Sequence, residues 1–155
     1  MGESIAGGCR CGAVRYTVRI AGPPKIYCCH CRHCQTWSGS AFTEQALVPL
    51  AAIGAEGGVS EFALTREDGS VSTQFICTAC HTRLWNVSSR WPALAALRAG
   101  TLDTAEILAP RLHIWTRRKQ PWIGLDPDVP AFEENAPPAE MMKLFNPQTA
   151  STGRD

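Results

Sequence analysis

Residues 27–42 read YCCHCRHCQTWSGSAF and carry four of the chain's eight cysteines within a span of seven residues. The other four form a C-x-C pair at Cys9 and Cys11 and a C-x-x-C pair at Cys77 and Cys80. The N-terminus, MGESIAGGC, has no apolar signal region, so we expect a cytoplasmic protein whose thiols stay reduced. In such a protein, closely spaced cysteines bind metal or do chemistry more often than they form disulfides.

The composition narrows the range of partners. A chain of 155 residues is typical of one domain, and 45% hydrophobic residues are enough to build a core. The formal net charge of +1 gives no strong field that would favour nucleic acid or a membrane surface. No apolar run approaches the ~20 residues needed to cross a bilayer. We therefore expect no membrane and no nucleic-acid partner, while homo-oligomer formation stays open.

The pattern of apolar and polar residues predicts a mainly β protein. Apolar and polar side chains alternate from Val14 to Ile20, as in a half-buried strand, within a predicted strand over residues 8–20. Asp68-Gly69 suits the turn of a hairpin, and GAEGG at residues 54–58 is predicted as a turn. The remaining predicted strands are residues 26–28, 41–48, 59–64, 71–76, 83–87 and 111–117.

The last third of the chain has less regular patterns. Residues 91–103, WPALAALRAGTLD, fit either a short helix or a buried strand. Prolines become frequent after residue 126, which predicts a loosely structured tail; we expect one domain over residues 1–132 and the tail over residues 133–155. Within this tail, Pro138 is predicted to begin a short helix.

Two cysteine groups have the spacing of metal ligands. A C-x-x-C turn places two sulfurs on one side of a tight knuckle, and a C-x-C pair on a strand places both on one face. Cys9, Cys11, Cys77 and Cys80 together predict a closed four-thiolate site, which is structural because it has no open position. Cys29, Cys31 and Cys34 would supply three thiolates from one short loop, the pattern of a catalytic zinc with a vacant fourth position.

The spacing alone leaves other ligand sets open. Cys28, Cys31 and Cys34 have C-x-x-C spacing twice, although Cys28 also reads as a small buried apolar residue. A single zinc ribbon would use Cys28–Cys34 with Cys77 and Cys80, leaving Cys9 and Cys11 free. His30 and His33 are interpreted as supporting or surface groups and not as ligands. His81 is a competing ligand, and His113 is interpreted as a hydrogen-bonded strand residue.

Five strings occur in an order that resembles a known family. They are GGCRCGAVRY, CHCRHCQTWSGSAF, FICTACHTRLW, LRAGTLD and HIWTRRKQPWIGL. From residue 7 to about residue 132 the chain closely resembles the glutathione-dependent formaldehyde-activating enzyme family, which also includes centromere protein V. One difference is His81, which stands where relatives usually have glycine; histidine tolerates the left-handed backbone that glycine permits there.

The resemblance implies a fold, two zinc ions and an activity. The fold is a β-tent of the Mss4-like group. The resemblance assigns a structural zinc to Cys9, Cys11, Cys77 and Cys80, and a catalytic zinc that meets the thiol substrate to Cys29, Cys31 and Cys34. The implied reaction is of the carbon–sulfur lyase type and combines glutathione with formaldehyde to form S-hydroxymethylglutathione.

Charge and donor groups near the cluster add to this expectation. Arg10, Arg32, His30 and His33 lie near in sequence and would offset the negative charge of a three-thiolate zinc, and backbone donors in SGS at residues 38–40 would receive glutathione carboxylates. The competing class is a non-catalytic zinc-binding thiol carrier or interaction module. The vacant fourth position favours an enzyme.

Overall fold

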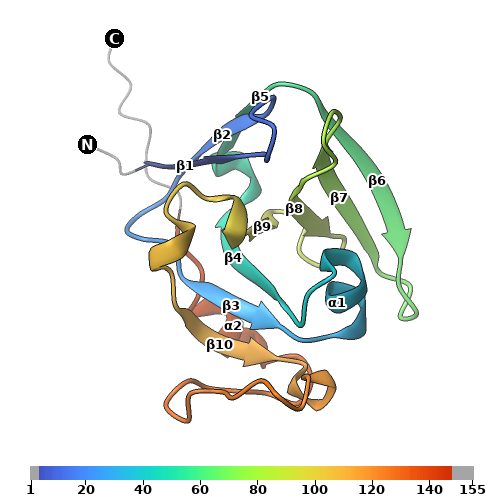
Figure 1. Cartoon of the computed structure of the whole chain (residues 1–155), viewed down its shortest axis with the longest axis vertical. Helices are drawn as coiled ribbons and strands as arrows, with labels where there is room; N and C mark the ends of the chain where they lie inside the picture. The colour runs from blue at the N-terminus through green and yellow to red at the C-terminus, as the bar shows by residue number, and fades with distance from the viewer. Residues whose placement is uncertain (1–3, 148–155) are drawn as a thin grey trace.

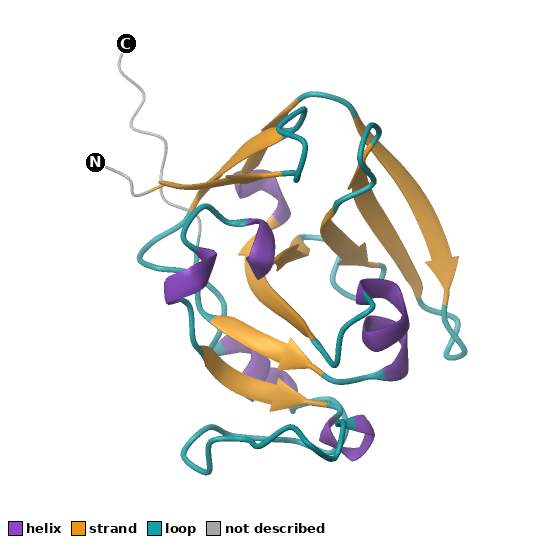
Figure 2. Ribbon diagram, in the orientation of Figure 1, coloured by secondary structure: helices purple, strands orange, loops and turns teal. Residues whose placement is uncertain are grey.

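The computed structural model describes residues 4–147, in which ten strands form two sheets (Figure 1). The strands are β1 (Ser4–Gly8), β2 (Arg15–Arg19), β3 (Ile26–Cys29), β4 (Thr43–Pro49), β5 (Ile53–Glu56), β6 (Val59–Thr65), β7 (Val71–Cys77), β8 (Arg83–Ser88), β9 (Leu94–Arg98) and β10 (Pro110–Ile114). The helices are α1 (Arg32–Ser38) and α2 (Pro138–Met142), with 3-10 turns at Leu50–Ala52, Ala99–Thr101, Ala105–Ile107 and Thr116–Arg118. Figure 2 shows that strands dominate, which confirms the predicted mainly β class.

The larger sheet has seven strands in the order β10-β3-β4-β9-β8-β7-β6. Only β10 and β3 run parallel; the other neighbours are antiparallel. The predicted hairpin is confirmed as β6–β7, and Gly69 has the positive φ of 77° that its turn needs. The Ser70 backbone N–H donates to Asp68 Oδ1 at 2.8 Å, which closes the turn.

The smaller sheet contains β1, β2 and β5 in that order. In β2 the burial alternates as predicted, with Tyr16 and Val18 buried between exposed neighbours. The prediction of a turn over residues 54–58 is wrong for its first part, because Gly54 pairs with Thr17 as part of β5. The chain turns at Gly57, whose φ is 102°.

The main core lies between the two sheets. Both sheets contribute fully buried apolar residues; they include Val14, Tyr16, Val18 and Ile20 from the smaller sheet and its ends, and Ile26, Val48, Leu84 and Leu97 from the larger sheet. Residues 91–103, which the pattern left ambiguous, form β9 and a 3-10 turn. β9 is central in its sheet and buried, which explains its continuous apolar run.

A second, smaller core lies around β3 and β10. It contains Tyr27 and Cys29 from β3 and Leu112 and Ile114 from β10, packed with the chain after residue 132; the buried members of that segment are Ala136 and Leu144. The predicted helix after Pro138 is confirmed as α2. Asn146 Nδ2 donates to the backbone oxygens of Ala21 and Pro23 at 2.8 and 3.1 Å, so residues up to 147 are held against the domain.

The domain boundary at residue 132 stays a prediction, and residues 148–155 of the predicted tail lie outside the described residues. Among residues 4–147, no helix has both the length and the apolar character that crossing a bilayer requires.

Candidate functional site

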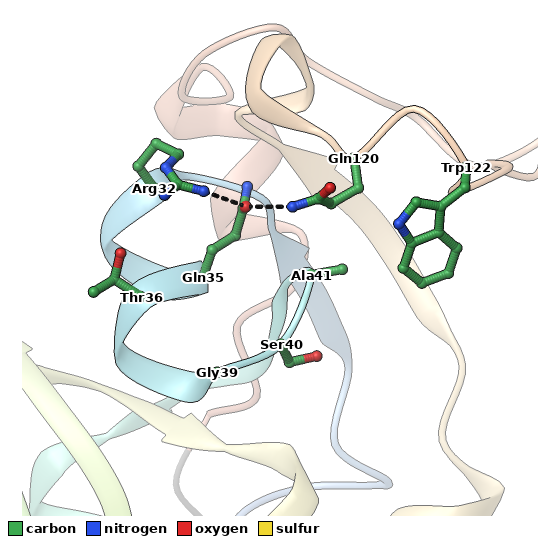
Figure 3. A pocket seen from close by; sticks show the side chains of 8 residues that line it. All are labelled: Arg32, Gln35, Thr36, Gly39, Ser40, Ala41, Gln120 and Trp122. Atoms are coloured by element: carbon green, nitrogen blue, oxygen red, sulfur yellow. Dashed lines mark hydrogen bonds between the residues drawn. The ribbon is translucent and has the colours of Figure 1, made fainter.

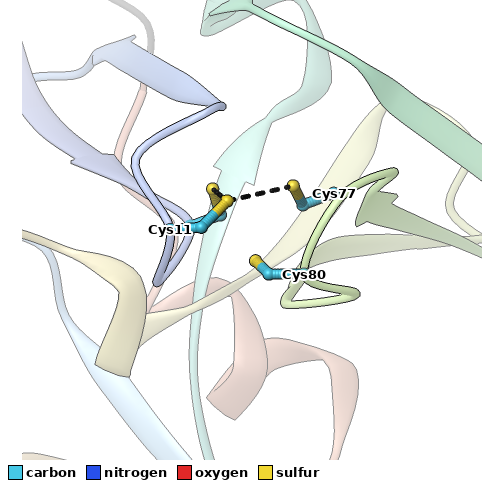
Figure 4. Close-up of side chains that lie close together, drawn as sticks. Cys11, Cys77 and Cys80 are labelled. Atoms are coloured by element: carbon cyan, nitrogen blue, oxygen red, sulfur yellow. Dashed lines mark hydrogen bonds between the residues drawn. The ribbon is translucent and has the colours of Figure 1, made fainter.

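Four thiols meet where the two sheets come together. Cys9 and Cys11 lie between β1 and β2, Cys77 ends β7, and Cys80 lies between β7 and β8. All four sulfurs lie within 4.8 Å of one another, and Figure 4 shows Cys11, Cys77 and Cys80 pointing to a common centre. Cys11 Sγ lies 3.5 Å from Cys9 Sγ and 3.9 Å from Cys77 Sγ. These separations are too long for disulfides and match the edge of about 3.8 Å that a tetrahedron with Zn–S of ~2.3 Å has.

Hydrogen-bond donors contact three of the four sulfurs. The Val14 backbone N–H donates to Cys9 Sγ at 3.2 Å, and the Ala79 N–H donates to Cys77 Sγ at 3.4 Å. Hydrogen bonds from the side chain and backbone of Thr82 lower the pKa of Cys80 to about 5. A closed set of four thiolates is the donor set of structural zinc, so these residues fit the metal.

His81 follows the second knuckle cysteine and adopts the left-handed conformation expected there, with φ of 59°. Its backbone N–H donates to the Cys77 carbonyl at 3.0 Å, which closes the knuckle. The knuckle therefore forms without glycine, and the His81 side chain lies outside both cysteine groups among the described residues.

Three further thiols gather at the start of α1. Cys29 ends β3, Cys31 is the residue that caps α1, and Cys34 lies in its first turn. Their sulfurs lie within 4.8 Å of one another. Cys31 accepts a hydrogen bond from the Cys34 backbone N–H at 3.4 Å, in the way an N-capping serine would. Gln45 Nε2, on the neighbouring strand β4, lies 3.7 Å from Cys34 Sγ.

The electrostatics of this group fit a cation. Hydrogen bonds from Cys29 and Cys31 lower the pKa of Cys34, which favours a single thiolate among the three sulfurs. The bonds with Cys31 and Cys34 raise the pKa of Cys29, which opposes a second negative charge. A soft dication would offset this repulsion, so the three residues fit zinc with one position left for another ligand.

Cys28 is separate from both groups. It is 2% exposed on β3, where successive side chains point to opposite faces. Burial raises the pKa of Cys28 to about 12, as expected for an inert buried thiol. The structure therefore brings Cys29 rather than Cys28 to Cys31 and Cys34.

The single zinc ribbon is not what the fold assembles. Its proposed partners, Cys77 and Cys80, lie with Cys9 and Cys11 instead of with the α1 cluster. The two groups also pack against different cores, because Cys9 and Cys77 belong to the main core and Cys29 belongs to the smaller one.

A buried histidine pair supports the segment that carries the three thiols. His30 is fully buried, and its Nε2 lies 3.0 Å from His113 Nδ1. The His30 carbonyl accepts a bond from Gln35 Nε2 at 2.7 Å, and the same amide donates to the Arg118 carbonyl at 2.8 Å. These bonds fix the path from β3 into α1, while His33 is exposed on the helix.

Two hollows lie on opposite faces of α1. The outer hollow, of about 350 Å³, is lined by Arg32, Gln35, Thr36, Gly39, Ser40, Ala41, Gln120 and Trp122 (Figure 3). Arg32 and Gln120 both donate to Gln35 Oε1 at 3.0 Å there. Residues three or four positions apart share a face of a helix. Cys34 therefore shares a face with Cys31 and Ser38 and not with Arg32, so it lies on the side away from the outer hollow.

The inner hollow, of about 330 Å³, is lined by Trp37, Ser38, Thr43, His81, Arg83 and Arg98. Sequence reasoning looked for cations close to the cluster along the chain, and so missed Arg83 and Arg98. The charge of Cys34 acts on both guanidinium groups. The only sequence signal for Arg98 is that a charged residue directly follows the apolar run ALAAL.

Comparison with known proteins gives consistent matches. Residues 4–118 match the family described as glutathione-dependent formaldehyde-activating enzyme. A Halomonas elongata protein, provisionally named a glutathione-dependent formaldehyde-activating enzyme, is 27% identical over 127 residues, covering 79% of this chain and 81% of the relative. An uncharacterized lyase of Schizosaccharomyces pombe is 28% identical over 79 residues, covering 51% of this chain and 54% of the relative.

A crystal structure of a Rhodobacter sphaeroides protein shares the fold. Its TM-score is 0.52 at 16% identity, and the match covers 64% of this chain and 89% of the other.

Proposed function

The chain belongs to the glutathione-dependent formaldehyde-activating enzyme family, and from this premise we propose that it joins a thiol such as glutathione to an aldehyde such as formaldehyde. The product would be S-hydroxymethylglutathione, and the activity is of the carbon–sulfur lyase type. Cys29, Cys31 and Cys34 would hold the zinc at which the thiol binds, and Cys9, Cys11, Cys77 and Cys80 would hold a structural zinc.

The observation that carries this proposal is the difference between the two thiol groups. One has four sulfurs, whereas the other has three, with no fourth Cys, His, Asp or Glu ligand atom grouped with them among residues 4–147. Three protein ligands and one open position are typical of a catalytic zinc, and four are typical of a structural one. A thiolate-rich site also favours a soft fourth ligand such as another thiol.

The reaction requires a thiolate. The sulfur attacks the carbonyl carbon of the aldehyde, a carbon–sulfur bond forms, the π electrons move to oxygen, and the oxygen takes a proton. A free thiol with a pKa near ~8.5 is only a few per cent thiolate at neutral pH. Bound zinc supplies stabilisation of the thiolate form of a coordinated substrate.

The chain's own residues hold the site in place. The Cys34 N–H fixes Cys31 Sγ, and Gln45 Nε2 lies against Cys34 Sγ. Gln45 is itself held by Thr43 Oγ1 at 2.8 Å and by the Tyr27 hydroxyl at 3.1 Å. Because Gln45, Thr43 and Tyr27 are buried, water is largely excluded from this side of the cluster.

Cobalt substitution tests the proposal, because thiolate ligation changes the visible spectrum. We expect glutathione to perturb the spectrum of the cobalt-loaded protein, Cys31→Ser to abolish the response, and Cys28→Ala to retain it. In the presence of glutathione, formaldehyde should be consumed faster with the zinc-loaded protein than without any protein. Binding without acceleration would instead identify a thiol carrier, and a spectrum unchanged by a panel of cellular thiols would refute thiol binding.

A further inference from the structure

The inner hollow beside the three-thiol cluster has a cationic wall with no carboxylate partner among residues 4–147. Its boundary meets the cluster at two points: Thr43 pairs with Cys29 in the β3–β4 register, and Ser38 Oγ donates to the Cys34 carbonyl at 2.8 Å. Arg83 and Arg98 line the same hollow. A molecule whose sulfur reaches Cys34 would therefore place its neighbouring groups against these arginines.

Arg98 is buried and Arg83 is partly buried, and neither has a carboxylate partner among the described residues. Arg98 is 9% exposed, and its hydrogen bond goes to the neutral amide oxygen of Asn86 at 2.8 Å. Arg83 donates to the neutral amide oxygen of Gln74 at 2.5 Å. Neither forms an ion pair with a described acidic residue. Three of their nitrogen atoms are buried and have no hydrogen-bond partner among residues 4–147: Nε of both arginines and Nη1 of Arg98.

A neutral hydrogen-bonded chain joins the two arginines and fixes their positions. Asn86 Nδ2 and Gln74 Nε2 both donate to Ser72 Oγ, at 3.3 and 2.7 Å. The Arg83 guanidinium also stacks 3.9 Å above the Trp37 ring on α1. The cationic wall is thus organised before any ligand arrives, which lowers the entropic cost of binding one.

The two positive charges lie in an environment that favours an incoming anion. Burial, and next the charge of Arg98, lower the pKa of Arg83 to about 9. A buried donor without a partner is destabilising, more so when it is charged, and an oxygen anion satisfies a guanidinium better than a neutral amide does.

We propose that the inner hollow binds a carboxylate of the substrate thiol, and that Arg83 and Arg98 select thiols that carry one. The inference rests on the proposed thiol-binding function and adds the class of substrate and the residues that recognise it. It replaces the expectation that backbone donors at residues 38–40 receive the glutathione carboxylates. Arg32, expected to offset the charge of the cluster, lines the outer hollow, where its guanidinium bonds to Gln35.

Calorimetric titration of the zinc-loaded protein, without aldehyde, tests the inference. Glutathione is compared with its diethyl ester, which keeps the thiol and lacks both carboxylates. We expect Arg83→Gln and Arg98→Gln each to weaken glutathione binding on the order of 10- to 100-fold and to leave ester binding within about twofold. Arg90→Gln, at an exposed ion pair with Asp68 in the β6–β7 hairpin region, is the matched control and should bind like the unaltered protein.

Three outcomes would overturn the inference. An equal loss for glutathione and the ester would mean that the arginines act on the sulfur charge and not on a carboxylate. A selective loss in Arg32→Gln alone would place the carboxylate in the outer hollow, while thiol binding would stand. Binding of neither thiol by the unaltered protein would refute the proposed function and the inference with it. If Arg98→Gln does not fold, the less buried Arg83→Gln gives the same readout.

Discussion

Replacing Cys11 by serine should destabilise the protein far more than its exposure suggests. The Cys11 side chain is exposed, and substitutions at exposed positions usually change the free energy of unfolding by about 0.5 kcal/mol or less. If Cys11 binds a structural zinc, the change removes one of four ligands. Structural zinc contributes on the order of 10 kcal/mol or more to folding, so one ligand accounts for roughly 3 kcal/mol.

The assay is thermal unfolding combined with measurement of zinc content. For a chain of this length, 1 kcal/mol corresponds to about 2–4 °C in Tm, so Cys11→Ser should lower Tm by roughly 6–12 °C and lose about one zinc ion per chain to a chelator that leaves the unaltered protein loaded. Cys28→Ala is the matched control, because this thiol is buried yet lies outside both clusters. It should keep the full zinc content.

Two results would refute this reasoning. If Cys11→Ser keeps its zinc and its Tm within about 2 °C, the four thiols do not form a structural site. If the protein folds normally after complete removal of metal, zinc does not support the fold at all.

The remaining predictions concern the second cluster and one turn. Cys31→Ser should release one zinc ion and leave the far-UV circular dichroism of the sheets nearly unchanged, because α1 lies outside the sheets; loss of the folded signal would contradict this separation. Gly57→Ala should unfold at lower urea than Gly69→Ala, because an added Cβ at Gly57 would lie 2.0 Å from the Ala13 carbonyl oxygen, whereas at Gly69 it meets nothing within 4 Å. Equal urea midpoints for the two variants would show that the close contact at Gly57 relaxes without cost.

The thiol groups illustrate how far sequence reasoning reaches. Because C-x-C and C-x-x-C have few local conformations, their spacing predicts which sulfurs lie on one side of a strand or knuckle. The pairing of residues 9 and 11 with residues 77 and 80 depends on the meeting of two sheets, and spacing alone left the zinc ribbon open. The choice between Cys28 and Cys29 depends on the facing of β3, which the resemblance anticipated and the structure shows.

Two short elements were missed for identifiable reasons. Strand β1 lacks alternation, since Ser4–Gly8 reads SIAGG, and it is a strand because β2 pairs with it. Helix α1 was expected as a loop, although Cys31 at its N-terminus and Gly39 with φ of 66° at its C-terminus are capping signals. Cysteine is not an expected capping residue, so the pattern resembled a metal-binding loop alone.

The sequence by itself determined the strand periods, the hairpin and the local C-x-C and C-x-x-C thiol pairs, because each depends on residues close together in the chain, and the order of the motifs carried the family likeness. Only the tertiary structure decided which groups surround the open side of the three-thiol cluster. Arg83 and Arg98 lie on neighbouring antiparallel strands, and Trp37 comes from a helix far earlier in the chain. Their shared hollow arises from the order in which strands pair, and strand order is set by the burial of whole sheet faces, which short-range patterns do not encode.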